Sequence, residues 1–144
     1  MILYSLIARG KNVLAEHTKM VGNFPTVTRV LLAKIPEGDG KMSYLYDKHI
    51  FHYLCDRGII FLCMCENEAT KKRIAFQFLD EIKTAWRTAY AEVESSAVAF
   101  AMQSEFSPVL EKQMSHFNDS KASDNIEKLR VQIDSVKEVT LKHI

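Results

Sequence analysis

The stretch IIFLCMC, residues 59–65, decides the fold class because each of its side chains is apolar. Successive side chains of a strand point to opposite faces, so a short run that is apolar on both faces is typical of an interior strand covered on each side. The chain opens with a second run of this kind, ILYSLIA at residues 2–8. We therefore predict two interior strands that are covered on both faces.

Shorter strands are predicted around these two runs, over residues 13–17, 41–46 and 50–55. The residues between them favour tight turns: Arg9-Gly10-Lys11-Asn12, Asp47-Lys48 and Asp56-Arg57-Gly58. Turns this short connect only antiparallel neighbours. The sequence therefore predicts an antiparallel sheet.

Further segments carry apolar side chains at helical spacing. The first begins near Pro25, a residue favoured in the first turn, and ends at Pro36. The second covers residues 70–90, and its first turn, Lys71-Lys72-Arg73, we interpret as a solvated end. The third is marked by Phe106, Val109, Leu110, Met114 and Phe117. We assign no structure to the connection over 91–104.

Composition narrows the class of protein. The length of 144 residues suits one domain with a short appendage. The net charge of +1, from 19 basic and 18 acidic residues, argues against a nucleic-acid binder. An odd count of 3 cysteines argues against a disulfide scaffold and suits a reducing compartment. No stretch approaches the ~20 apolar residues that a membrane-spanning helix requires.

The sequence carries none of the common catalytic motifs G-x-S-x-G, H-E-x-x-H or C-x-x-C. A zinc site is conceivable from the chemistry of five side chains on neighbouring strands, but packed, reduced cysteines are the favoured interpretation because two of them lie inside an apolar run. The five are His49, His52, Cys55, Cys63 and Cys65. We predict a binding protein without enzymatic activity, catalytic residues, metal or cofactor.

After a polar linker at 118–124, the composition shifts. Apolar-biased positions then recur at alternating spacings of three and four, which is the seam of a coiled coil. The seam residues are Ile126, Leu129, Ile133, Val136, Thr140 and His143. A segment this short is not a stable helix alone, so it should wait for partner helices or fold back on the domain, either as an amphipathic helix or as an extended segment.

Several local sequences resemble those of the longin-domain vesicle-associated membrane proteins, the R-type SNAREs, nearly from end to end. The closest resemblance is to the tetanus-insensitive, endo-lysosomal branch. The residues that carry it are Ala8-Arg9-Gly10, Gly22-Asn23-Phe24, Leu32-Ala33-Lys34-Ile35-Pro36, Lys41-Met42-Ser43-Tyr44, Phe51-His52-Tyr53, the stretches 75–83 and 102–107, and the start of a SNARE motif at 131–137.

The resemblance implies an α+β fold of the longin, profilin-like type. Its sheet would be five-stranded and antiparallel, with one helix on one face, two helices on the other, and the start of a SNARE helix. The longin domain would cover 1–117, the linker 118–124 and the N-terminal part of the SNARE motif 125–144. The ionic-layer arginine of that motif is expected at about residue 150 by heptad arithmetic, so the chain is expected to stop inside the motif.

The resemblance also implies a function. The domain would bind its own SNARE segment, or a peptide of a cytosolic adaptor or regulator, and so control SNARE assembly, membrane fusion and sorting. Full-length members would meet Q-SNAREs of the target membrane, on the cytosolic face of endosomal, lysosomal or secretory vesicles. They reach the membrane through a C-terminal anchor absent from this chain, which is expected to be soluble. The alternative is a longin-like subunit of a tethering or adaptor complex without SNARE activity.

In the family, the bound segment lies in a groove between the first helix and the third strand. The matching positions here are Val30 and Leu31 on the helix, with Met42 and Tyr44 on the strand. Met repacks easily, and Tyr offers a large contact area with a polar tip. The alternative is that all four are ordinary core residues, because one face of this strand is internal in any case.

Overall fold

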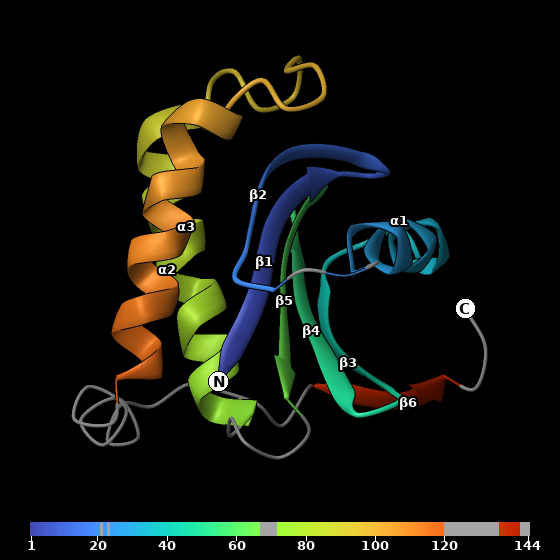
Figure 1. Ribbon diagram of the computed structural model, residues 1–144. Coiled ribbons are helices and arrows are strands. Elements are labelled where there is room, and N and C mark those ends of the chain that lie inside the picture. Colours follow the sequence, from blue (N-terminus) through green and yellow to red (C-terminus); the bar gives the residue numbers. More distant parts are fainter. Residues whose placement is uncertain (21, 23, 67–71, 120–135, 142–144) are drawn as a thin grey trace.

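The computed structural model describes residues 1–20, 22, 24–66, 72–119 and 136–141. One mixed sheet carries helix α1 on one face and helices α2 and α3 on the other (Figure 1). These layers confirm the predicted α+β class. The elements in chain order are β1 (Ile2–Arg9), β2 (Asn12–Thr18), α1 (Phe24–Lys34), β3 (Gly40–Tyr46), β4 (His49–Asp56), β5 (Ile59–Glu66), α2 (Lys72–Tyr90), α3 (Gln103–Asn118) and β6 (Lys137–Leu141).

The strands are ordered β2-β1-β5-β4-β3-β6. Neighbours among the first five strands pair antiparallel, as predicted. Strand β6 pairs parallel with β3, so the sheet has one strand more than expected. Both apolar runs are interior strands, as predicted, because every side chain from Ile2 to Ala8 and from Ile59 to Cys65 is buried.

Each face of the sheet has its own apolar core. The alternation along β5 divides them: Phe61 and Cys63 lie in the core under α2 and α3, while Leu62 and Met64 lie in the core under α1. We call these the α2/α3-side core and the α1-side core. Each large side chain that is fully buried, such as Trp86, contributes roughly 1.5–3 kcal/mol. The sheet is therefore held from both faces.

Helix α3 begins and ends outside the range that its apolar spacing marked. Its last residue, Asn118, accepts a hydrogen bond from the backbone N–H of Ile2 at 2.7 Å. The Asn118 side chain also donates to the carbonyl of Ile2 at 3.0 Å. Asn118 therefore fastens the end of α3 to the start of β1, although the sequence places it in the linker.

The C-terminal segment takes the extended one of its two expected docked forms. The heptad seam favours a helix, but residues 137–141 form strand β6. Two β-branched residues, Val139 and Thr140, favour extended backbone, and β3 offers an unpaired edge. The seam positions Ile126, Leu129, Ile133 and His143 lie outside the described residues. Within the described part of the chain, no helix has both the length and the apolar character needed to cross a membrane.

Candidate functional site at the outer edge of β3

The outer edge of β3 is the place where the chain binds a segment of itself. Residues 42–46 of β3 lie in register with residues 137–141 of β6, so that Ser43 faces Glu138 and Tyr44 faces Val139. Without β6 this edge would present a row of unpaired backbone donors and acceptors. The site is thus a sheet edge long enough to pair with one strand, with side chains on both faces of the sheet beside it.

On the α1 side, the structure brings together most of the predicted groove residues. Leu31 and Tyr44 are buried in the α1-side core, and Met42 packs against that core while partly exposed. Val30 lies apart, with 37% of its surface exposed on α1. Since partners in a ladder share a face, Val139 of β6 stands beside Tyr44, and 38% of its surface is exposed.

The tyrosine at this site belongs to a buried pair. The rings of Tyr44 and Tyr53 have their centroids 5.8 Å apart. Burial, and then the neighbouring Tyr44, raise the pKa of Tyr53 well above its ordinary value. Tyr53 is therefore neutral at physiological pH, and the two rings form a packed aromatic floor beneath the α1 face of β3.

On the α2 side, β6 makes two side-chain contacts. Val136, the residue just before β6, packs against the α2/α3-side core. Glu138 forms an ion pair and hydrogen bond with the ammonium group of Lys72, in the first turn of α2. The contact corrects the interpretation of this turn as a solvated end. Sequence reasoning missed it because the two residues are 66 positions apart.

Behind the edge, the interior of the sheet is polar at one row. Ser43 and His52 share a buried hydrogen bond, with Ser43 Oγ 2.7 Å from Nδ1 of His52. The next residue in the row is Cys63, directly opposite His52 on β5. Burial raises the pKa of the Cys63 thiol, and its hydrogen bond to Cys65 lowers the pKa of that second thiol.

These cysteines are free and buried, as is Cys55. Among the residues that the structure describes, no group of three or more His, Cys, Asp or Glu side chains is arranged to hold a metal ion. The row therefore presents packed thiols and one serine–histidine pair to the α2 helix. We assign this row of side chains, which runs inward from β3 through β4 to β5, a structural role in the sheet.

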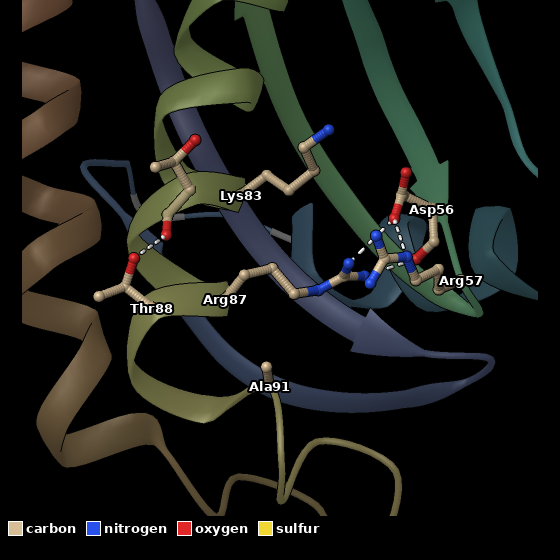
Figure 2. Close-up of a pocket in the computed structure, with 7 residues that line it drawn as sticks. Asp56, Arg57, Lys83, Arg87, Thr88 and Ala91 are labelled. Atoms are coloured by element: carbon tan, nitrogen blue, oxygen red, sulfur yellow. Dashed lines mark hydrogen bonds and ion pairs between the residues drawn. The ribbon is translucent and has the colours of Figure 1, made fainter.

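A surface pocket of about 420 Å³ lies where α2 meets the β4–β5 turn. Figure 2 shows the guanidinium groups of Arg57 and Arg87 converging on Asp56. Arg87 donates to Asp56 Oδ1 at 2.9 Å and to the Asp56 carbonyl at 2.7 Å. The lining residues are Asp56, Arg57, Lys83, Thr84, Arg87, Thr88 and Ala91.

The charged groups of this pocket chiefly bind one another. The Nε of Arg87 donates to Glu94 at 3.1 Å, and the same buried carboxylate accepts from the indole N–H of Trp86 at 2.7 Å. Arg87 thus joins the β4–β5 turn to the loop after α2. We assign the pocket this fastening role and place the candidate functional site at the β3 edge.

Comparisons with known proteins agree with this architecture. Residues 14–110 match the longin family model, described as a regulated-SNARE-like domain. The chain is 43% identical over 143 residues to vesicle-associated membrane protein 7B of Dictyostelium discoideum, covering 99% of this chain and 55% of that protein. It is 38% identical to human vesicle-associated membrane protein 7, covering 99% of this chain and 64% of that protein.

A plant relative, vesicle-associated membrane protein 712 of Arabidopsis thaliana, is 36% identical over 144 residues, or 65% of its length. The chain thus spans between about half and two thirds of the length of these curated relatives. The family model extends from β2 into α3 and so includes the strand whose edge carries β6. This chain belongs to the longin, or regulated-SNARE-like, domain family.

Proposed function

We propose that this chain is the regulatory part of a vesicle R-SNARE, in which the longin domain holds a segment of the SNARE motif on the edge of β3. The observation that carries the proposal is the parallel ladder between residues 42–46 and 137–141. In the full-length protein the held segment would be withdrawn from Q-SNAREs of the target membrane. The protein would act on the cytosolic face of endosomal, lysosomal or secretory vesicles, without enzymatic activity.

The strand and the SNARE helix use the same residues in incompatible ways. In the heptad seam, Val136 and Thr140 lie on one helical face, and Glu138 lies outside that face. In β6, side chains alternate, so Glu138 shares a face with Val136 while Val139 points to the other side. A residue that pairs with β3 has extended backbone and cannot enter a helical bundle. Docking and SNARE assembly are therefore mutually exclusive for this segment.

Weak contacts suffice for this kind of docking. The segment is tethered to the domain, so its effective concentration at β3 is on the order of millimolar. A ladder of backbone hydrogen bonds, each with a net worth of about 1 kcal/mol, then competes with the open state. The equilibrium between the docked and open states of the segment can therefore be shifted, as regulation requires.

The same edge is a natural site for an adaptor or regulator peptide. Of the four predicted groove residues, the partly exposed Met42 and Val30 would meet apolar side chains of such a peptide, while Leu31 and Tyr44 lie in the core beneath them. The alternative function, a tethering-complex subunit without SNARE activity, lacks support of this kind, because the relatives reported above are named as vesicle-associated membrane proteins.

The test replaces the strand residues of the groove. We expect Met42→Ser with Tyr44→Ser to raise the amide hydrogen-exchange rates of residues 137–141 at least tenfold, because Val139 loses its apolar neighbours. Met20→Ser, at an exposed methionine, is the control and should leave those rates unchanged.

A second variant keeps the experiment decisive if loss of Tyr44 loosens the core. Val136→Asp places a carboxylate against the α2/α3-side core and leaves the residues of the α1-side core intact. It should also release 137–141 while β1 and β5 stay protected. Equal, unprotected exchange of this segment in wild type and both variants would contradict autoinhibition.

A further inference from the structure

We infer that the β3 edge, once β6 has left it, binds an extended segment of a partner protein that runs parallel to β3 and carries an apolar residue followed two positions later by an acidic one. Lys72 is the residue that selects this acid. The inference rests on the proposed function, since the edge opens only when the chain's own segment departs. It adds the chemistry by which a partner is chosen.

The departure of β6 leaves the outer edge of β3 unpaired. Five consecutive residues of β3, 42–46, lose their ladder partners together. A sheet edge with a row of free N–H and C=O groups is a template for an added strand. An extended peptide therefore fits this surface better than a helix does, and the register of β6 gives its direction.

The surface beside this edge, at the start of α2, is positively charged. Helix α2 begins with Lys72 and Arg73, and its first turn contains no acidic residue. The N-terminus of a helix already carries partial positive charge, so this end is doubly electropositive. Among the described residues, the carboxylate paired with Lys72 is that of Glu138, which comes from the docked strand and not from the domain. The acid is thus a property of the ligand.

The spacing of the two β6 residues that face α2 defines the pattern of the ligand. Val136 and Glu138 are two residues apart, so an extended segment turns both toward α2. The opposite face is more permissive, because Val139 beside Tyr44 remains 38% exposed. Selection therefore comes from the α2 face, with the pattern apolar-x-acidic.

The first experiment reverses the charges within the chain. Lys72→Glu and Glu138→Lys should each raise the amide exchange rates of 137–141 about two- to fivefold, the range for a partly exposed ion pair. The double variant should restore wild-type rates. Lys83→Glu, at the other half of α2, is the matched control. Rates insensitive to Lys72→Glu, or no rescue in the double variant, would overturn the role of Lys72.

The second experiment supplies the segment from outside. The host is the whole chain carrying Val136→Asp, which frees the edge. The probes are a peptide with the sequence of residues 136–141 and the same peptide with Lys in place of Glu138, each at millimolar concentration. Backbone amide shifts of residues 42–46 should show tighter binding of the acidic peptide. In a host that also carries Lys72→Glu, the order should invert.

The outcomes separate the two proposals. Equal binding of both peptides, or no binding, overturns the partner pattern. A dimer of the opened chain in sedimentation, with no response to peptide, overturns it in favour of a second copy. If Met42→Ser with Tyr44→Ser frees 137–141 while Lys72→Glu changes nothing, autoinhibition stands and the inference fails. If 137–141 exchange without protection already in the wild-type chain, autoinhibition itself fails.

Discussion

The two outer edges of the sheet are covered in different ways. At β2, the backbone N–H groups of Phe100 and Met102 donate to Val13 and Leu14 at 2.8 and 3.2 Å. The side chain of Gln103 then binds both backbone groups of Glu16, at 2.7 and 2.9 Å. At β3, the cover is β6, which follows the predicted linker and lies inside the predicted SNARE motif.

The cover of β2 is built into the domain, because it is the short connection between α2 and α3. Arg9 also fixes this connection, donating to the carbonyls of Glu94 and Ala97 at 2.6 and 2.8 Å. The cover of β3 is a segment that we also expect to take part in SNARE assembly. An edge closed by the domain's own connection protects against aggregation, whereas an edge closed by a segment with another use can act as a switch.

Among the variants that test this difference between the two edges, we expect the largest loss of stability from a substitution at Arg87. Arg87→Met removes the cation between Asp56 and Glu94 and leaves a buried carboxylate without its charge partner. We expect a loss of about 3 kcal/mol in the free energy of unfolding, measured by urea denaturation. Exchange at 100–102 should rise with it, since the loop loses its anchor.

Lys83→Met is the control for that variant, because Lys83 lines the same pocket and is ion-paired with the exposed Asp80 at 3.7 Å. Its effect should stay below about 0.5 kcal/mol. If both variants lose the same stability, the pocket does not fasten the loop in the way we describe.

Alkaline pH should lower the free energy of unfolding through two buried tyrosines, one on β1 and one on β4. Burial, then Glu16, raises the pKa of Tyr4, and burial, then Tyr44, raises the pKa of Tyr53. Above about pH 10 an unfolded tyrosine loses its proton while these two keep theirs, so the folded state binds more protons and stability falls as pH rises. We expect a loss of about 1.4 kcal/mol per pH unit for each tyrosine.

Urea denaturation at several pH values from 9 to 11 measures this slope. Tyr53→Phe should lower the slope by about 1.4 kcal/mol per pH unit, the share of one tyrosine. A slope that Tyr53→Phe does not alter would place the titrating groups elsewhere.

The difference between the edges also marks how far the sequence could predict the structure. Runs that are apolar on both faces predict the interior strands, and apolar residues four positions apart predict helix α2. These patterns are local, so the antiparallel sheet and the individual helices follow from residues such as Phe61 and Ile74. The placement of the helices on the two faces came from the family resemblance.

The cover of each edge was not predictable, because it depends on distant partners. Nothing near Gln103 indicates that its amide binds the backbone of Glu16, and nothing near Lys72 points to Glu138. For residues 137–141 the heptad spacing predicts a helix, and the β-branched pair Val139 and Thr140 is too short a signal to outweigh it. The free edge of β3, a tertiary feature, decides for the strand.

The smallest expected effect concerns the built-in cover of β2. Gln103→Ala removes two hydrogen bonds to the backbone of Glu16 and should lower the free energy of unfolding by about 1 kcal/mol, since water can replace part of them. Gln113→Ala, on the same helix, is the control. Exchange should rise at Glu16 and stay slow at 137–141, because the two edges lie on opposite sides of the sheet. A rise at both would mean that they open together, and β6 would then respond to the stability of the whole domain rather than act as a separate switch.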